Sequence, residues 1–246
     1  MTDAPFRLNR KLDVAAHAKR YAARGRAHIP DILEPEGAER LASFLEAEPR
    51  WNLVTLIAGR HRDLDSAGMS RQSPEEKAKF VAHVHQPARE GRFQYLYENI
   101  PVYDAWHARR AERPLLDAFF EFLNGEEFLA FGRAVTGADD IGFADAQATR
   151  YGPGHFLTMH DDRVENKDRR AAYVVNLTRQ WSPDWGGLTV FATPDLHIEE
   201  AFTPRFNALN IFKVPQPHAV TLVAPFAARA RYGVTGWLRA GEDPGP

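Results

Sequence analysis

The sequence predicts an α+β fold, in which helices of the N-terminal half pack against a β-rich core of the barrel or jelly-roll type. Two observations predict it. Residues 1–140 are mixed but mostly helical in their apolar spacing. From about Phe143 onwards, short apolar segments recur, with Gly, Pro and Asp in the gaps between them. Such a series of short strands is typical of a double sheet or barrel.

In the N-terminal half, residues 12–24 have helical spacing, and residues 35–48 place Leu41, Phe44 and Leu45 on one face of an amphipathic helix. The stretch from Ser73 to Glu76 is a capping box with proline at the first helical position, so a helix is expected to start there. The other elements expected are strands at residues 27–33, 51–59 and 93–102, a polar surface loop at residues 59–72, and two helices that divide near Asn124 and Gly125.

The C-terminal half is expected to consist of recurring short strands, and the tail from Gly241 is expected to be frayed. The simplest organisation is a single domain over residues 1–246. In it, residues 1–140 form a helical and mixed support region, and residues 141–240 form the β core. The strands expected in this core are residues 145–151, 155–162, 170–178, 187–192, 197–202, 207–214, 218–225 and 230–239.

Composition excludes several classes of protein. The chain has no cysteine, which rules out disulfides, thiolate metal sites, iron–sulfur clusters and a cysteine nucleophile, and which fits the cytoplasm. The net charge is -2 without a long basic run, so no nucleic-acid partner is expected. The N-terminus lacks the apolar segment of a signal peptide, and no apolar run reaches the roughly 18 residues of a membrane span. Any metal must therefore be held by His, Asp or Glu.

The stretch YGPGHFLTMHDDR contains the strongest candidate for a metal site. His160 and Asp162 are two residues apart in an expected strand, so their side chains would lie on one side while Asp161 faces away. Alone, this pair is weak evidence, because a solvated turn fits it as well. His218 begins another apolar strand and supplies a third ligand. Two histidines and one carboxylate form the facial triad of non-heme Fe(II) oxygenases, which leaves coordination positions open.

A charged residue in the last apolar strand adds to this candidate site. Arg231 must be paired if it is buried, because an unpaired guanidinium is costly to desolvate. Its planar fork suits a bidentate carboxylate contact. Strand parity places Arg231, Gly233, Thr235 and Trp237 on the same face. A salt bridge to a local acid is the alternative reading.

Taken together, these motifs resemble the Fe(II)- and 2-oxoglutarate-dependent dioxygenases, specifically their prolyl-hydroxylase branch. The similar pieces span residues 151–239 and occur in the family's order. They are YGPGHFLTMHDD, RRAAYVVNLT, WSPDWGGLTVF, FNALNIFKVPQPHAV and RYGVTGWLR. The resemblance implies a double-stranded β-helix of the jelly-roll, cupin-like kind.

The resemblance also implies a role for individual residues. His160, Asp162 and His218 would be iron ligands, and Arg231 would hold the distal carboxylate of 2-oxoglutarate. Thr235 would assist on the same face, and Tyr151 would line the cosubstrate pocket. Two positions depart from relatives: Asn176 stands where some have a tyrosine that contacts the cosubstrate, and Gly233 stands where several have a serine. Tyr173 lies near Asn176 in sequence but on the opposite face of its strand.

The implied reaction is hydroxylation of a prolyl residue in a protein or peptide, with decarboxylation of 2-oxoglutarate to succinate and CO2. Its cofactors would be Fe(II), 2-oxoglutarate and O2, with ascorbate as an auxiliary reductant. One alternative keeps the chemistry but changes the substrate to a free amino acid or small metabolite. Another is a catalytically inactive jelly-roll binding protein. A zinc hydrolase could use the same three ligands but would leave Arg231 unexplained.

Several further features have two open readings. His155 is expected on the face opposite His160 and is not assigned as a ligand, and His197 is expected near the barrel edge. Residues 59–72 could form a lid or a disordered loop, and His83 and His85 could belong to a lid or be ordinary surface residues. Trp181 and Trp185 could line a substrate entrance or pack in the core. Arg163 and the run Lys167–Arg170 could attract an acidic substrate or form a solvated loop.

Overall fold

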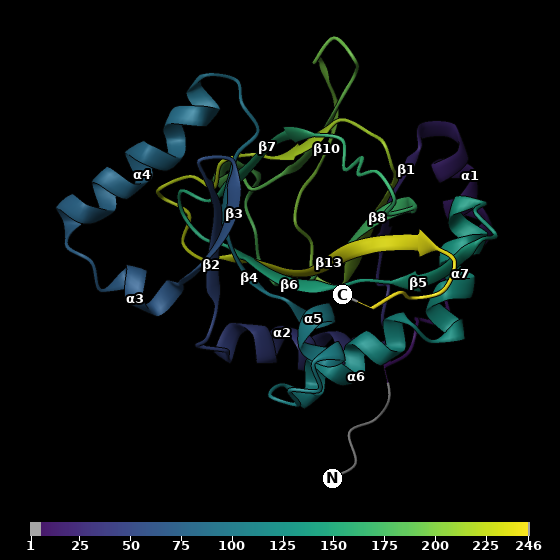
Figure 1. Cartoon of the computed structure of the whole chain (residues 1–246). Helices are drawn as coiled ribbons and strands as arrows, with labels where there is room; N and C mark the ends of the chain where they lie inside the picture. Colours follow the sequence, from purple (N-terminus) through teal and green to yellow (C-terminus); the bar gives the residue numbers. More distant parts are fainter. Residues whose placement is uncertain (1–5, 246) are drawn as a thin grey trace.

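The computed structural model describes residues 6–245, and their strands form one 13-stranded sheet that curls into a nearly closed antiparallel barrel (Figure 1). Residues 1–5 of the N-terminus and Pro246 of the tail lie outside this range. The predicted α+β class with a jelly-roll-type core is confirmed. None of the described helices is long and apolar enough to span a membrane.

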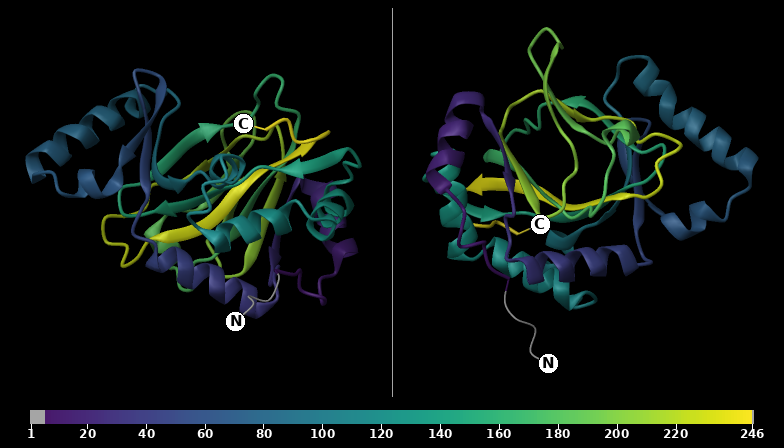
Figure 2. Two further views of the ribbon diagram at one scale, coloured as in Figure 1. Left: turned by 60° about the horizontal axis from the view of Figure 1, so that its bottom comes forward. Right: turned by 180° about the vertical axis from the view of Figure 1, so that it is seen from behind.

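The helices surround the barrel on several sides (Figures 1 and 2). In Figure 1, α2, α5 and α6 lie below it, α1 and α7 lie on the right, and α3 and α4 lie on the left. The helices are α1 (Val14–Arg24), α2 (Pro35–Ala47), α3 (Ser66–Ser70), α4 (Pro74–Arg89), α5 (Val102–His107), α6 (Pro114–Leu123) and α7 (Glu126–Thr136), with a 3-10 helix at Pro183–Trp185.

The strands follow the order β1-β11-β8-β13-β6-β4-β7-β12-β9-β10, with β2, β3 and β5 attached beside this path. They are β1 (Arg26–Pro30), β2 (Asn52–Ile57), β3 (Arg60–Asp65), β4 (Tyr95–Ile100), β5 (Ile141–Ala144), β6 (Gln147–Tyr151), β7 (Phe156–His160), β8 (Arg169–Asn176), β9 (Thr189–Ala192), β10 (Ile198–Phe202), β11 (Ala208–Lys213), β12 (His218–Val220) and β13 (Arg231–Ala240).

The N-terminal half is more than a helical support. Strand β4 lies between β6 and β7, and β1 pairs with β11 along five residues. The sheet therefore depends on strands from both halves of the sequence. That the chain is a single domain stays a prediction.

The two faces of the sheet have different surroundings: one packs against the helices, and the other lines a cavity. Along β8, Tyr173 and Val175 point to the helix-covered side and join the main apolar cluster, while Ala172 and Val174 line a cavity inside the barrel. This alternation follows from the two-residue period of a strand. Burial against the helices stabilises one face and leaves the inner face free to carry a site.

Most expected elements are present, and the capping box is confirmed. The Ser73 hydroxyl accepts a hydrogen bond from the Glu76 N–H (3.2 Å), and the Glu76 carboxylate accepts one from the Ser73 N–H (2.8 Å). The expectation of a structureless loop at residues 59–72 is wrong, because β3 and α3 lie there. Most residues of β3 are exposed, so its sequence lacks the apolar alternation that marks a half-buried strand.

The tail expected to fray is anchored at Asp243. Its carboxylate accepts a hydrogen bond from the Tyr103 hydroxyl at 2.5 Å and lies 3.0 Å from Nε2 of His107. Both partners belong to α5, an element that the sequence did not predict. Because the anchor depends on this unrecognised helix, composition alone could not reveal it.

Candidate metal centre

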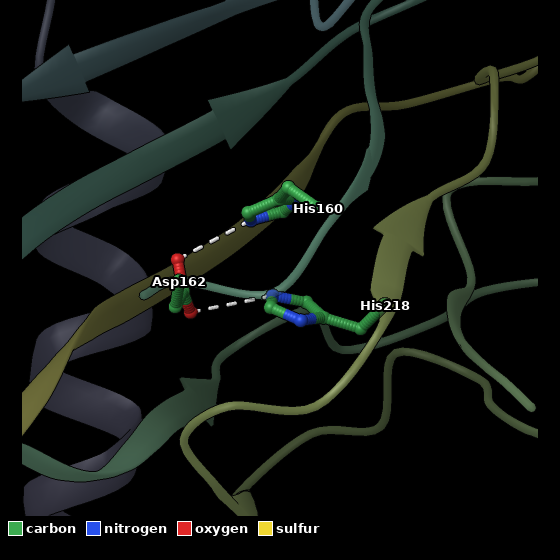
Figure 3. Close-up of side chains that lie close together, drawn as sticks. All are labelled: His160, Asp162 and His218. Carbon is green, nitrogen blue, oxygen red and sulfur yellow. Dashed lines mark ion pairs between the residues drawn. The ribbon is translucent and has the colours of Figure 1, made fainter. Parts of the chain in front are cut away.

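His160, Asp162 and His218 come together, and their side chains point toward one another (Figure 3). His160 ends β7, His218 begins β12, and the two residues are directly paired across these antiparallel strands. The Nε2 atoms of His160 and His218 lie 3.3 and 3.4 Å from the two carboxylate oxygens of Asp162. One ligand atom from each residue lies within 4.8 Å of the others, so a single cation could contact all three.

Asp162 reaches this position by a different route from the one expected. Strand β7 ends at His160, and Asp162 has a left-handed backbone with φ of 63°. Strand parity therefore does not explain why its carboxylate meets His160. The neighbouring Asp161 borders the cavity but is not part of the cluster. Its side chain is 44% exposed, and its carboxylate accepts a hydrogen bond from the Arg163 N–H.

Backbone carbonyls determine which nitrogen each imidazole offers. Nδ1 of His160 donates to the Thr158 carbonyl (2.9 Å), and Nδ1 of His218 donates to the Gln216 carbonyl (2.8 Å). Since a carbonyl can only accept, Nδ1 carries the proton and Nε2 keeps its lone pair. Both Nε2 atoms face Asp162, as metal ligands require.

The pKa values of the cluster suit cation binding at neutral pH. Burial, assisted by the neighbouring His160, lowers the pKa of His218 to about 4. Burial would raise the pKa of Asp162, but the adjacent imidazoles of His160 and His218 outweigh this effect and lower it to about 2. His218 is thus available as a neutral donor beside an ionised carboxylate. This donor set fits a divalent transition metal such as Fe(II).

The cluster opens into a cavity of about 430 Å³ inside the barrel. This volume lies within the range of about 300–1,000 Å³ found for small-molecule pockets. The triad is part of the lining of this cavity. The lining also includes Tyr97, Tyr151, Arg169, Arg231, Thr235 and Trp237.

Arg231 lines this cavity and is 4% exposed. Its Nη1 donates to the Gly187 carbonyl (2.7 Å), and its Nη2 donates to the Thr189 hydroxyl (3.2 Å). Within residues 6–245 no carboxylate pairs with it, and burial lowers its pKa. The predicted alternative of a local salt bridge therefore does not apply. A buried guanidinium without a counter-ion, facing an open cavity, is a strong candidate for anion binding.

Of the remaining candidate residues, Tyr151 and Thr235 line this cavity, whereas Asn176 does not. Tyr151 lines it, stacks on Tyr97 with ring centroids 5.0 Å apart, and stays protonated because burial raises its pKa. Thr235 also lines it, although its hydroxyl donates to the Tyr173 carbonyl. Asn176 is fully buried outside the lining, and its amide donates to the carbonyls of Val174 and Ala208.

Steric contact with the neighbouring strand explains why position 233 is a glycine. A Cβ atom added there would lie 2.9 Å from the carbonyl oxygen of Val175 on the adjacent strand β8. Backbone atoms cannot move aside as a side chain can. The close approach of β13 and β8 therefore explains why this chain has no serine at Gly233.

Sequence reasoning missed two parts of the cavity. Tyr95 and Tyr97 of β4 line it, but nothing in the sequence indicates that β4 enters the sheet between β6 and β7. Arg169 was interpreted only as part of a basic run. Its Nη1 in fact donates to the backbone carbonyl of Asp162 at 2.9 Å.

The other histidines lie away from the metal cluster. His155 accepts a hydrogen bond from the Gly152 N–H and lines a separate pocket, and His197 is exposed. His83 and His85 lie within α4 rather than after it, and His85 packs against Phe156.

The two tryptophans near the Gly186-Gly187 turn pack against each other. Trp181 donates its indole N–H to the Gly186 carbonyl at 2.9 Å, and its ring centroid lies 5.3 Å from that of Trp185. Trp181 also packs against the small cluster around Tyr151 and Val223. These contacts support the packing interpretation, and they connect Trp181 to the turn that holds Arg231.

Comparisons with known proteins agree with this geometry. Residues 146–239 match the family model described as the 2OG-Fe(II) oxygenase superfamily. A curated relative, prolyl 3-hydroxylase OGFOD1 of Mus musculus, is 28% identical over 120 residues, covering 46% of this chain and 22% of that protein. The chain thus spans about a fifth of the length of this relative. The resemblance to the prolyl-hydroxylase branch is confirmed.

Solved structures with the same fold include a Pseudomonas putida prolyl-4-hydroxylase, with a TM-score of 0.56 and 18% identity over 93% of this chain and 99% of that one. A Trichoplax adhaerens prolyl hydroxylase, solved with a peptide fragment of hypoxia inducible factor, gives a TM-score of 0.60 and 13% identity, covering 92% and 89%. A Burkholderia pseudomallei oxidoreductase of the 2OG-Fe(II) oxygenase family gives 0.60 and 15%, covering both chains fully. At these identities the likeness concerns the fold alone.

Proposed function

Because residues 146–239 match the family model of the 2OG-Fe(II) oxygenase superfamily, we propose that the protein is an Fe(II)- and 2-oxoglutarate-dependent dioxygenase. Its proposed reaction hydroxylates a prolyl residue of a protein or peptide and converts 2-oxoglutarate to succinate and CO2. The cytoplasmic location expected from the sequence stays a prediction.

One observation carries this proposal: the uncompensated Arg231 shares a cavity with the histidine–aspartate cluster. A dicarboxylate that chelates a metal at one end needs a cationic anchor at the other, and a guanidinium matches a carboxylate with two parallel hydrogen bonds. A zinc hydrolase would need the three ligands but not the arginine. A binding protein without turnover would need neither the open ligand set nor the anchor.

In the proposed enzyme, His160, Asp162 and His218 hold Fe(II) through Nε2, a carboxylate oxygen and Nε2. Arg231 pairs with the distal carboxylate of 2-oxoglutarate, and Tyr151 is a phenolic donor beside it. The bound iron and 2-oxoglutarate, together with O2, supply the oxidising chemistry. Ascorbate would keep the iron reduced. The protein's own contribution is to orient the bound groups and to limit the access of water.

The prolyl substrate is supported by the relatives named prolyl hydroxylases and by the mouth of the cavity. Phe93 and Val164 line the cavity and are 45% and 48% exposed, so apolar surface is available to a ring or a peptide side chain. The second candidate is the same chemistry on a free amino acid or small metabolite. The cavity's volume favours it, because a small molecule would fill the space without a peptide groove.

The proposal is tested by anaerobic reconstitution with Fe(II) and 2-oxoglutarate, followed by addition of O2. The wild type should form succinate, slowly without substrate and faster with it, whereas His160→Ala and Asp162→Ala should form none. Free proline and proline-containing peptides compared in this assay separate the two substrate classes. Mass spectrometry for a +16 shift in cell proteins identifies the target. The proposal fails if the wild type neither binds 2-oxoglutarate nor consumes it with any of these substrates.

A further inference from the structure

Asp162 has an unusual backbone for a residue that must present a ligand. Its φ of 63° is in the left-handed region, which costs roughly 1–2 kcal/mol for a residue with a Cβ atom. Since β7 ends at His160, ladder hydrogen bonds of the strand do not hold Asp162. Another group must stabilise this conformation, or the carboxylate would lose its place between the two imidazoles.

Arg169 makes the relevant contact. Its Nη1 donates to the carbonyl oxygen of Asp162 at 2.9 Å, and both residues line the cavity. The carboxylate of Asp162 instead faces His160 and His218. Arg169 thus holds the backbone of Asp162 and leaves its carboxylate oxygens free for a metal.

Arg169 is itself held in place. Its guanidinium carbon lies 3.5 Å from the centre of the Trp237 ring, a close stack of a planar cation on an aromatic face. The two residues come from β8 and β13, which pair along most of their length. The stack fixes the direction of the guanidinium, which long side chains otherwise lack.

We propose that Arg169, stacked on Trp237, is a positioning residue that holds Asp162 in its left-handed conformation and so pre-organises the metal site. This inference rests on the metal site of the proposed function. Arg169 acts through Asp162, and no contact between Arg169 and the metal is needed. Metal centres depend on such supporting contacts, whose loss typically lowers metal affinity by about 10–100-fold.

Charge repulsion alone predicts the opposite change in metal affinity when Arg169 is replaced, so the two explanations can be distinguished. A guanidinium beside a cation site repels the cation, so removing its charge should strengthen metal binding. The positioning role requires that removing Arg169 weakens it. The sign of the change therefore separates the two effects.

Titration calorimetry with Co(II), which occupies such sites without turnover, measures the affinity directly. Arg169→Met should bind Co(II) about 10–100-fold more weakly than the wild type. Arg169→Lys should also bind it more weakly, because lysine keeps the charge but loses the planar fork. The visible spectrum of bound Co(II) should change in both variants, since a displaced Asp162 alters the ligand field.

Arg163→Met is the matched control. Arg163 lies on the loop between β7 and β8 and also borders the cavity, but its side chain is 70% exposed and its ion pair with Asp161 is 4.0 Å long. This variant loses one positive charge near the proposed metal site but keeps the hydrogen bond from Arg169 to the Asp162 carbonyl. It should bind Co(II) as tightly as the wild type or slightly more tightly.

A chemical rescue experiment distinguishes a positioning role of Arg169 from a role in folding alone. In Arg169→Ala, added methylguanidinium should restore Co(II) affinity and spectrum, whereas it cannot repair a misfolded protein. If Arg169→Met does not fold, the spectrum of Co(II) bound to Arg169→Lys and the methylguanidinium rescue test the inference instead. Unchanged or tighter binding by the folded Arg169 variants overturns the inference while the metal site stands. Failure of the wild type to bind Co(II) instead overturns the metal site of the proposed function.

Discussion

Two adjacent aspartates in the sequence HDDR have opposite environments. The Asp162 side chain is 9% exposed and lies between two imidazoles, whereas the Asp161 side chain is 44% exposed and accepts a hydrogen bond from the Arg163 N–H. Asp162→Ala should therefore lower affinity for Fe(II) or Co(II) by more than about 100-fold, exceeding the loss of a supporting contact. Asp161→Ala should change it by no more than about twofold, as a surface substitution does. Calorimetry and metal content check both, and metal loss in Asp161→Ala would contradict the ligand assignment.

Arg231 gives a second prediction for a single residue. Arg231→Ala should weaken binding of 2-oxoglutarate to the Co(II)-loaded protein by at least about 30-fold, since losing one partner of a buried charged contact costs about 2 kcal/mol or more. Metal affinity should be unchanged, because the guanidinium bonds Gly187 and Thr189 rather than the triad. Arg231→Lys, which keeps the charge but loses the fork, should show an intermediate loss. A variant that binds 2-oxoglutarate normally but loses metal would reverse the assigned role.

For single residues, the sequence predicted which side chains form the site but not how the backbone positions them. His160, Asp162, His218 and Arg231 were selected from spacing and residue type, and the structure brings all four to one cavity. The parity argument for Asp162 was nevertheless wrong. A single left-handed residue after a strand end leaves no pattern in a sequence, because aspartate tolerates that conformation without requiring it.

Among the elements, the turn at Gly186-Gly187 connects backbone geometry to anion binding. Gly187 has φ of 60°, and its carbonyl accepts the hydrogen bond from Arg231. Gly187→Ala should lower stability by about 1–2 kcal/mol for the left-handed backbone and also weaken 2-oxoglutarate binding, because Arg231 loses its fixed acceptor. Gly154→Ala is the control: φ there is 85°, and an added Cβ meets nothing within 4 Å. It should lower the thermal midpoint but leave 2-oxoglutarate affinity intact, and equal affinities in both variants would contradict the link.

The junction of β5 and β6 should make stability depend on pH. Burial raises the pKa of Asp145 to about 6, although its carboxylate accepts a hydrogen bond from the Trp237 N–H and lies near Arg169 and Arg239. Between about pH 4 and pH 6 the folded state keeps a proton that the unfolded state has lost. The free energy of unfolding should therefore fall as pH rises through this window, by up to about 3 kcal/mol.

Asp145→Asn tests this element. The amide oxygen can still accept from Trp237, and the buried charge is gone, so the variant should be more stable than the wild type at pH 7.5 and lack the fall between pH 4 and pH 6. Denaturant titrations at several pH values measure both. Asp140→Asn removes a nearby carboxylate whose pKa is instead lowered by Arg170, and it should bring no gain in stability. A wild-type stability that rises through this window would disprove the expectation.

Elements were predictable where one face is buried. The helix at Pro35–Ala47 buries Leu41 and Leu45 and shows the expected spacing. The short strand β5 and the short helix α5 were missed, because four and six residues carry too little periodicity. The exposed strand β3 was missed because it has no buried face.

For the whole molecule, the order of strands was beyond the reach of the sequence. Spacing indicated a barrel or jelly roll, but the neighbours in a sheet depend on packing between distant segments rather than on local pattern. The division at residue 140 into a support region and a β core reflected this limit. It placed β4 outside the core, whereas β4 joins the wall that carries Tyr151 to the wall that carries His160.

This topology predicts that residues 141–246 cannot fold alone. Without β4, strands β6 and β7 lose their shared neighbour, and without β1 the edge of β11 is unpaired. The helices that bury the outer face of the sheet would also be missing, so a large apolar surface would face water. The fragment should show no cooperative thermal transition, no near-ultraviolet circular dichroism and no Co(II) binding, whereas the full chain should unfold in one transition. Mixing it with residues 1–140 should restore Co(II) binding if the two parts can reassociate. A fragment that unfolds cooperatively and binds Co(II) by itself would mean that the metal wall is stable without β4.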